Sequence, residues 1–390
     1  MAIVMSVNLK GGVAKTTTAV AIAECLASES YRTLLIDGDH QCMAGELLLG
    51  EDRQVKAEDN KRNLHCLFMD MMFNEADLTP DEFDKRITRQ VSNIGGGLEK
   101  LAVLPCSIRM DAIEEKIRKR LKDYPELSRG DITERFKKRR GQLGKWLKQA
   151  FDFVIIDCPP SFGFPVKTFL SIADGYIVPC VPDRLSVRGS LYLMDRISKG
   201  GYKLPGIGTL WSLYRKENIL HRNRVEGWGN GADPNGLDSL PRPFETIIPN
   251  ATSIAEAAEV VGAGIAPKNF RNKYTAPFAK LFEDVSKELV QRSQWQRPDI
   301  HNTPSPTPAL AQNEKVIPMG RPYFHHSIQQ LENEFEKHWA NLPKVRLLRA
   351  ELDHRSKPRS LQLRAKIDAH LEVAAGTAPP GHSPSTSLAR

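Results

Sequence analysis

Short runs of apolar residues recur along roughly the first 290 positions, and segments with helical periodicity separate most of them. The runs have the length of buried strands and are too short to cross a membrane. Such an alternation is typical of an α/β protein with a doubly wound, mostly parallel sheet. The runs that predict strands are residues 2–7, 33–36, 101–104, 153–156, 176–181 and 206–213.

A charged segment at about residues 107–150 interrupts this alternation and predicts a helical insertion in a sheet domain that spans residues 1–294. Its basic run at 135–148 has two interpretations: a solvated helix face, or salt-dependent contact with a nucleic-acid backbone. The basic residues of the run are Arg135, Lys137, Lys138, Arg139, Arg140, Lys145 and Lys148.

The composition changes after residue 294. Residues 295–323 are rich in proline and polar residues, which indicates a linker. Residues 324–373 predict a helical extension with breaks near Pro343 and Pro358. The last residues, 374–390, are rich in Gly, Pro and Ser, and we expect a disordered tail.

The net charge of the 390-residue chain is +8, from 55 Lys and Arg against 47 Asp and Glu. This excess permits contact with nucleic acid or an anionic membrane but is too diffuse to establish either. The six cysteines stand singly, which argues against a zinc module or a disulfide framework. No membrane-spanning run or signal-peptide pattern is visible, so the expected location is the cytoplasm.

The first predicted strand leads into a glycine-containing loop, and a periodic segment at about 16–28 predicts a helix after it. This is the context in which a loop binds phosphate, although Leu9 and Ala14 occupy the two glycine positions of the general motif. Gly11 and Gly12 let backbone N–H groups turn toward an anion at a helix N-terminus. The sequence therefore predicts a nucleotide site.

Two side chains of this loop carry the expected chemistry. Lys15 can reach the β- and γ-phosphates of ATP, and the Thr16 hydroxyl can ligate Mg²⁺. ATP and Mg²⁺ are therefore the expected cofactors.

The loop resembles the deviant Walker A motif, Lys-Gly-Gly-x-x-Lys-Thr/Ser, of the ParA/MinD family of P-loop ATPases. Four further segments resemble motifs of that family in the same order, and the similarity is greatest to the ParA-type, Soj-like partition ATPases. The resemblance covers roughly residues 1–290 and implies a slow, partner-stimulated ATPase. The four segments are residues 34–41, 151–161, 178–182 and 244–250.

The resemblance also implies roles for single residues. Lys10 would reach across a sandwich dimer to the partner's nucleotide, while Lys15 holds the phosphates of its own subunit. Asp39 would orient or polarise the attacking water, which makes these three residues the catalytic candidates. The implied Mg²⁺ residues are Thr16, Asp37 and Asp157. The implied nucleotide contacts are Gly11, Gly12, Val13, Ala14, Lys15, Thr16, Thr17 and Pro249.

Two positions depart from the family pattern. Ala14 replaces a glycine, which restricts the loop if that position needs a positive φ. His40 replaces a proline and could loosen the turn that carries Asp39. Neither change removes a charged group, so we expect nucleotide binding to persist, with the rate of hydrolysis open.

The favoured interpretation is a Mg-ATP-dependent, dimerising switch that partitions plasmids or chromosomes or positions cargo. A ParB-like partner would stimulate it, the dimer would bind non-specific DNA, and no membrane contact is expected. The candidate DNA contacts are Arg215, Lys216, Arg222 and Arg224.

Three alternatives stay open. A MinD-like membrane-cycling ATPase would need a terminal amphipathic helix. An ATP-gated scaffold in a multi-component system, for example in defence, would explain the long region after residue 294. A ligase or reductase on the same fold would need a second substrate motif, and none is recognisable.

Overall fold

The computed structural model divides into two units, residues 1–319 and 320–390, which are described separately. The predicted linker at 295–323 lies outside the described residues, and so does the predicted tail beyond residue 374. The structure describes residues 1–74, 76, 78–123, 128–229, 236–259, 266–294, 328–339, 342–353 and 358–374.

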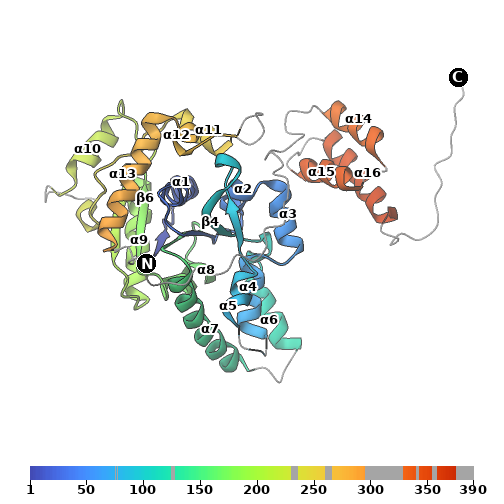
Figure 1. The fold of residues 1–390 in the computed structure, drawn as a ribbon, viewed down its shortest axis with the longest axis horizontal. Helices are drawn as coiled ribbons and strands as arrows, with labels where there is room; N and C mark the ends of the chain where they lie inside the picture. The colour runs from blue at the N-terminus through green and yellow to red at the C-terminus, as the bar shows by residue number, and fades with distance from the viewer. Residues whose placement is uncertain are drawn as a thin grey trace, which may run out of the picture. The chain divides into compact units, whose positions relative to one another are not determined.

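A seven-stranded sheet forms the centre of the first unit (Figure 1). The strand order is β3-β4-β2-β5-β1-β6-β7, and all neighbouring strands are parallel except β3 and β4. The predicted class, a doubly wound and mostly parallel sheet, is confirmed. The strands are β1 (Ala2–Ser6), β2 (Thr33–Asp37), β3 (Thr88–Val91), β4 (Leu98–Leu104), β5 (Phe153–Asp157), β6 (Gly175–Cys180) and β7 (Gly206–Trp211).

The apolar pattern did not predict β3. Its sequence is Thr-Arg-Gln-Val, and only Val91 is buried. The strand lies at the edge of the sheet, antiparallel to β4. An edge strand in that position needs no continuous apolar run, because one of its sides faces solvent.

The three central strands bring distant segments of the chain together. In the parallel registers, Ser6 of β1 and Asp37 of β2 are both paired with Asp157 of β5. Loops that follow parallel strands open at one edge of the sheet. The glycine loop and the two acidic strand ends are therefore neighbours, although they are far apart in the sequence.

Helices cover both faces of the sheet (Figure 1), because successive strand residues point to opposite sides. Ile3 and Met5 belong to one apolar layer, with α4, α7, α8 and α9, and Val4 belongs to the other, with α1, α2, α12 and α13. The helices of this unit are α1 (Lys15–Ser28), α2 (Met43–Leu49), α3 (Glu51–Asp59), α4 (Leu64–Phe73), α5 (Pro80–Asp84), α6 (Ile113–Asp123), α7 (Arg129–Ala150), α8 (Phe164–Leu170), α9 (Arg184–Lys199), α10 (Ile219–Gly227), α11 (Thr252–Glu259), α12 (Phe270–Tyr274) and α13 (Ala276–Arg292).

The segment at 107–150 contains α6 and the long helix α7, whose basic run is not simply a solvated face. Arg139 is only 2% exposed, and its guanidinium donates to the carbonyls of Asp70, Asn74 and Ala76 at 2.9, 2.8 and 2.6 Å. Asp70 lies in the last turn of α4, Asn74 is its C-cap and Ala76 follows it, so the guanidinium caps the C-terminal end of this helix. The interpretation as a solvated face is therefore wrong for Arg139, which joins α7 to α4.

The second unit is a three-helix assembly with a core of its own. It consists of α14 (Ile328–His338), α15 (Leu342–Asp353) and α16 (Pro358–Ala374), and proline is tolerated at helix starts such as that of α16. The core residues are Leu331, Phe335, Val345, Leu348, Leu352, Leu363 and Ile367. Among the described helices of either unit, none has the length and apolar character needed to cross a membrane.

Candidate functional site

Side chains from neighbouring strands hold the glycine loop in place. Asn8 is fully buried; its amide donates to the carbonyl of Pro179 at 2.8 Å, and its side-chain oxygen accepts from the N–H of Lys10 at 2.9 Å. Ser212, just after β7, donates to the carbonyl of Val13 at 2.9 Å. The sequence pattern did not single out Asn8 or Ser212; the available signal was a polar residue directly after an apolar strand.

Two loop positions have a left-handed backbone. The φ angles are +70° at Gly12 and +59° at Ala14. A Cβ atom costs about 1–2 kcal/mol in this region of conformational space, so the replacement of glycine by alanine strains the loop at position 14. The surrounding contacts nevertheless keep the loop closed around Lys15, the first residue of α1.

The ammonium of Lys15 is turned into the loop, where it donates to the carbonyl of Lys10 at 3.1 Å. Lys15 is only 7% exposed, and burial lowers its pKa, while the charges of Asp157 and Asp39 act in the opposite direction. A poorly hydrated ammonium of this kind is suited to bind a phosphate oxygen. Lys10, in contrast, is exposed to solvent.

Asp157 ends β5 beside the first turn of α1. Both oxygens of its buried carboxylate lack a hydrogen bond within the described part of the chain. Burial raises the pKa of Asp157 to about 7, opposed by the nearby Thr16 hydroxyl and by the charge of Lys15. A buried carboxyl without partners is costly in the free protein, which is typical of a group that awaits a ligand.

Asp37 is buried at the end of β2, but its oxygens have partners. They accept from the N–H groups of Asp39 at 3.1 Å and Gly45 at 2.8 Å. Burial and the charge of Asp157 raise the pKa of Asp37 well above its usual value. Gly38 allows the close approach of the two strand ends, because a Cβ there would lie 2.8 Å from the carbonyl oxygen of Asp157.

Asp39 lies in a turn that continues with His40, Gln41 and Cys42. The Asp39 carbonyl accepts from the N–H of Cys42 at 2.9 Å, and its carboxylate accepts from the N–H of Gln41 at 3.1 Å. The imidazole Nδ1 of His40 is 3.5 Å from the same carboxylate oxygen. The turn is therefore closed without proline, and the imidazole of His40 lies next to the carboxylate of Asp39.

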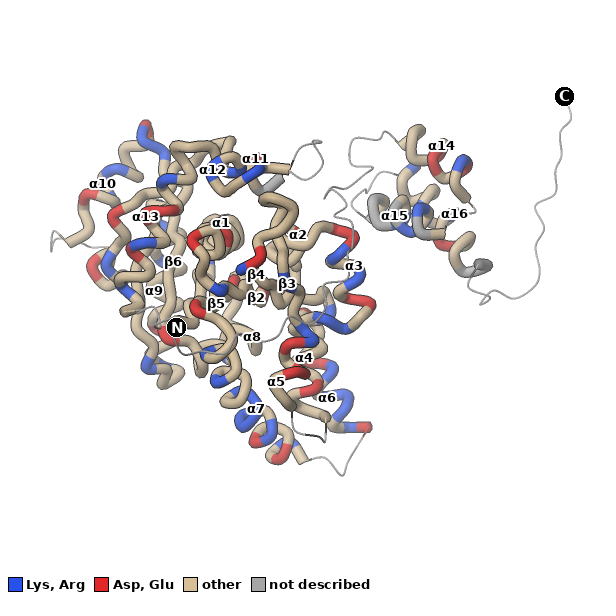
Figure 2. The backbone as a smooth tube through the Cα atoms, in the orientation of Figure 1, with Lys and Arg blue, Asp and Glu red and all other residues tan. Residues whose placement is uncertain are grey.

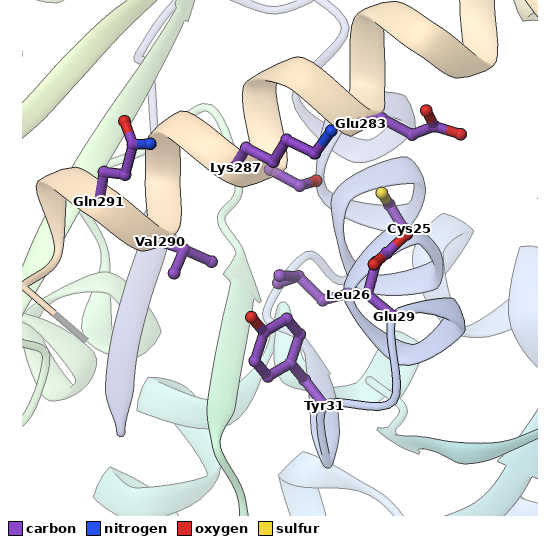
Figure 3. Close-up of a pocket in the computed structure, with 9 residues that line it drawn as sticks. Cys25, Leu26, Glu29, Tyr31, Glu283, Lys287, Val290 and Gln291 are labelled. Atoms are coloured by element: carbon purple, nitrogen blue, oxygen red, sulfur yellow. The ribbon is translucent and has the colours of Figure 1, made fainter. Parts of the chain in front are cut away.

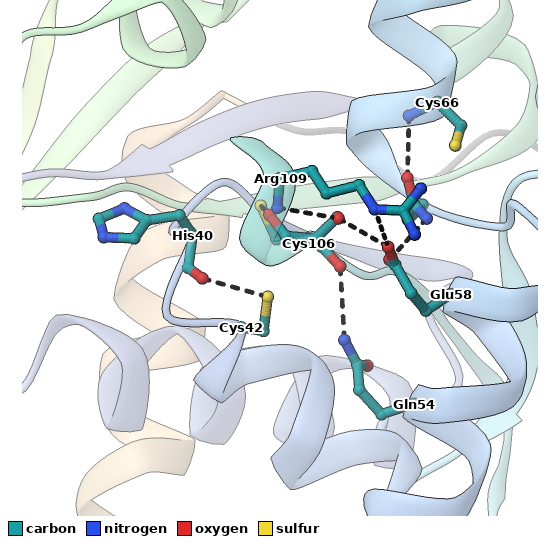
Figure 4. A network of polar contacts seen from close by, with 9 residues as sticks. His40, Cys42, Gln54, Glu58, Cys66, Cys106 and Arg109 are labelled. Atoms are coloured by element: carbon teal, nitrogen blue, oxygen red, sulfur yellow. Dashed lines mark hydrogen bonds and ion pairs between the residues drawn. The ribbon is translucent and has the colours of Figure 1, made fainter. Parts of the chain in front are cut away.

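A polar network extends from this turn toward α4 (Figure 4). The Cys42 thiol donates to the carbonyl of His40 at 3.4 Å, and Gln54 donates to the carbonyl of Cys106 at 3.4 Å. The neighbouring Cys42 thiol and burial raise the pKa of Cys106 well above its usual value. The Cys106 thiol is therefore suited to a structural role rather than to nucleophilic chemistry.

The predicted motif at residues 244–250 pairs with the segment that follows β7. The Ile248 carbonyl accepts from the N–H of Tyr214 at 3.1 Å, and the N–H of Asn250 donates to the Tyr214 carbonyl at 2.8 Å. These bonds hold Pro249, the predicted nucleotide contact, beside the segment that follows β7.

The four candidates for DNA contact are not equivalent. With its amide oxygen turned toward Arg215, Asn250 accepts from Nε at 2.9 Å and Nη2 at 3.1 Å. Arg224 is half-buried on α10. Arg215, Lys216 and Arg222 are all exposed, and of these three only Arg215 is engaged by Asn250.

The oxygen donors at this edge fit Mg²⁺ when a nucleotide is bound. The partnerless carboxylate of Asp157 and the Thr16 hydroxyl are the donor types that Mg²⁺ prefers. Within the described ranges, no group of three or more His, Cys, Asp or Glu side chains is arranged to hold a metal by itself.

A cavity of about 200 Å³ opens at the other end of α1, against α13 (Figure 3). Leu26 and Val290 supply apolar lining, with Cys25 and Lys287 beside them. Small-molecule sites usually enclose about 300–1,000 Å³, and we assign no ligand to this smaller space.

The sheet, the glycine loop and the acidic strand ends define a nucleotide-binding protein with the P-loop fold. The model of a family described as "AAA domain" matches residues 1–202. The chain belongs to the ParA family of P-loop ATPases.

Individual relatives agree with this assignment. The chromosome partitioning protein ParA of Myxococcus xanthus is 27% identical over 299 residues, which cover 74% of this chain and 89% of that protein. Soj, a sporulation initiation inhibitor of Bacillus subtilis, is 29% identical over 195 residues, 50% of this chain and 64% of Soj. The ATP complex of Cyanothece McdA has the same fold, with a TM-score of 0.53 at 16% identity over 77% of this chain and 98% of McdA.

Proposed function

We propose that this protein is a Mg-ATP-dependent ATPase switch of the ParA type, which dimerises with ATP and acts in partition or cargo positioning. The observation that carries the proposal is that a buried Lys15 and a buried Asp157, whose carboxylate oxygens have no hydrogen bond among the described residues, lie at the same end of the sheet. Such an arrangement is costly in the free protein, and a magnesium nucleotide would supply the missing opposite charges.

The two lysines of the loop have different tasks in this proposal. Lys15 is buried and binds the phosphates of its own subunit. Lys10 is exposed, so its ammonium is free to contact a nucleotide held by a second copy. ATP would then favour the dimer, because the γ-phosphate contacts Lys10 only in that state.

The acidic residues also have different tasks in this proposal. Thr16 and Asp157 would hold Mg²⁺, which neutralises charge on the phosphates when it is bound. Asp37 supports the site by accepting backbone hydrogen bonds that shape the loop after β2. Asp39 would accept a hydrogen bond from the attacking water and orient it.

Membership of the ParA family suggests which molecules this protein binds. We propose an ATP-dependent homodimer in the cytoplasm that binds DNA without sequence preference and is stimulated by a ParB-like protein. A MinD-like membrane cycle would instead require ATP-dependent binding to vesicles, and we expect none.

The test compares ATP turnover and oligomeric state for wild type and for Lys15→Ala, Asp39→Ala and Lys10→Ala. Lys15→Ala should lose nucleotide binding, whereas Asp39→Ala should bind ATP and accumulate as a dimer with turnover at least about 100-fold lower. Lys10→Ala should bind ATP but remain monomeric. The matched control is Asp59→Ala, an exposed carboxylate at the end of α3. Normal turnover in Asp39→Ala would refute the role given to Asp39.

A second candidate function is an ATP-gated scaffold, and the three-helix unit with its own core favours it. The same measurements distinguish the two functions. ATP-dependent dimers without turnover, even with DNA and a partner present, would support the scaffold and contradict the switch.

A further inference from the structure

The segment at 107–150 carries most of the excess positive charge of the chain. It contains fourteen Lys and Arg against seven Asp and Glu, a net charge of +7 in a chain whose total is +8. Figure 2 shows basic positions along both α6 and α7. The excess is therefore concentrated in one part of the fold.

Several basic side chains of α7 are already engaged within the protein. Arg139 is buried against the end of α4, and Arg135 donates to the carbonyl of Asn74 at 3.3 Å. Lys137 pairs with Glu134 at 3.7 Å, and Lys148 pairs with Asp174 at 2.7 Å. Four of the seven basic residues of the run are thus engaged within the protein, and of these four only Arg139 is buried.

Helix α6 differs, because it presents an exposed group of four basic residues that we call the α6 cationic row. None of the four forms an ion pair with another described residue. The row consists of Lys116, Arg118, Lys119 and Lys122.

The other side of α6 fixes the helix to the protein. Ile113 belongs to the apolar layer beneath the sheet, and Ile117 and Leu121 pack against it. The guanidinium of Arg120 stacks on Phe73, at 5.0 Å from the ring centre, where α4 ends. Because α4 is also held by Arg139, the cationic row stands on a supported surface, which lowers the entropy lost when it binds a partner.

We propose that the α6 cationic row binds the phosphate backbone of nucleic acid. Lys116 and Lys122 are six residues apart, about 9 Å along the helix axis, so the side chains of the row can reach more than one phosphate of a DNA strand. A membrane surface fits less well, because the apolar positions of α6 face inward and leave no apolar stripe to insert. The proposal rests on the DNA binding of the proposed function. It places the contact with DNA on α6 instead of on the predicted residues Arg215, Lys216, Arg222 and Arg224.

The experiment measures binding of the full-length protein with Mg-ATP to a mixed-sequence duplex by fluorescence anisotropy, between about 50 and 300 mM salt. The test variant combines Lys116→Gln, Arg118→Gln, Lys119→Gln and Lys122→Gln. A comparison variant, called the α10 variant, combines Lys216→Gln, just before α10, with Arg222→Gln on that helix. A charge-matched control neutralises four other exposed lysines, Lys100, Lys199, Lys280 and Lys287.

The α6 variant should bind at least about tenfold more weakly, with a salt slope reduced by about 0.9 for each lost phosphate contact. The charge-matched control and the α10 variant should stay within about threefold of wild type at one salt concentration. An unchanged thermal midpoint and unchanged ATP binding would show that the α6 variant is folded.

Other outcomes overturn the proposal in distinguishable ways. If wild type binds DNA and the α6 variant keeps its affinity and salt slope, or only the α10 variant loses them, the inference about α6 fails while the proposed function stands. If wild type shows no affinity for the duplex, both the inference and the DNA binding of the proposed function fail. Binding to vesicles with anionic lipids that depends on α6, without binding to DNA, would identify a membrane surface instead.

Discussion

Two clusters of buried charge lie along the same helix, α1, and they are built in opposite ways. At its first residue, Lys15 faces Asp157, whose oxygens have no partner within the described residues. Nine residues further on, about 14 Å along the axis, Glu24 is fully buried and fully partnered. It accepts from Lys273 at 2.7 Å, Tyr274 at 2.8 Å and Ser92 at 2.6 Å.

The two clusters differ in whether their buried polar atoms have partners, and this difference indicates different roles. The Glu24 cluster joins α1 to α12 and to the turn after β3, and every charge in it is compensated. The Lys15 and Asp157 cluster leaves polar atoms unsatisfied at the open edge of the sheet, which costs stability in the free protein. We infer that the first cluster holds the fold together and that the second is reserved for a ligand.

The largest effect is expected when one partner is removed from the Glu24 cluster, in which every buried charge is compensated. Lys273→Met should lower the free energy of unfolding by about 3–5 kcal/mol, because it leaves the buried charge of Glu24 uncompensated. Urea unfolding measures the effect. The control is Lys280→Met, which breaks an exposed ion pair with Asp284 and should cost less than about 1 kcal/mol. Equal losses in the two variants would contradict the distinction.

His65 is a second buried polar side chain without hydrogen bonds among the described residues, and it shows that this property alone does not identify a ligand site. Its ring is buried in α4, and neither nitrogen has a hydrogen bond among the described residues. Burial and the charges of Lys116 and Arg109 lower the pKa of His65 to about 4. We assign it no ligand, because both charged groups that act on it, Lys116 and Arg109, are cations.

The consequence for stability follows from the direction of this shift. Below about pH 6.5 the unfolded chain binds a proton at His65, while the folded protein stays neutral there until about pH 4. The free energy of unfolding should therefore fall by about 3 kcal/mol as the pH drops through this window. In His65→Leu that part of the pH dependence should disappear, and identical pH profiles for the variant and wild type would refute the assignment.

The unsatisfied cluster should respond in the opposite direction to Lys273→Met. Asp157→Asn removes an unpaired buried charge, so the free protein should become more stable by about 1–3 kcal/mol. The gain in stability that Mg-ATP gives to wild type should be lost in this variant, as measured by thermal unfolding. Asp152→Asn is the matched control at the other end of β5, because it breaks the 2.9 Å pair with Arg32 and should only destabilise. If Asp157→Asn destabilised the free protein, Asp157 would belong to the scaffold.

The smallest expected effect concerns the strain in the loop itself. Ala14→Gly should stabilise the free protein by up to about 1 kcal/mol, because glycine adopts the positive φ of position 14 without strain, partly offset by greater freedom of the unfolded chain. Ala19→Gly, in the interior of α1, should lose about 1 kcal/mol or more. Chemical unfolding of the two variants compares them, and a loss in both would show that position 14 is not strained.

Much of this architecture can be predicted from the sequence because its signals are local. Apolar runs of strand length identified the six strands on the parallel part of the sheet, and the periodic segment after the glycine loop predicted helix α1. The edge strand β3 escaped prediction because its Thr-Arg-Gln-Val sequence has no apolar run. The sequence grouped Arg139 with surface cations, because the composition of the basic run does not show that Arg139 contacts the end of α4.

By itself, the sequence determined the class of protein: a phosphate loop with two lysines, followed by acidic residues at the ends of apolar runs, has few other interpretations. Tertiary structure decided which of those charges are satisfied. Burial and hydrogen bonding depend on strands that pair across more than a hundred residues, as β1 does with β5, and no local pattern encodes them. For the same reason, only the folded chain shows that Arg139 of the basic run is structural, while the less conspicuous row on α6 faces solvent.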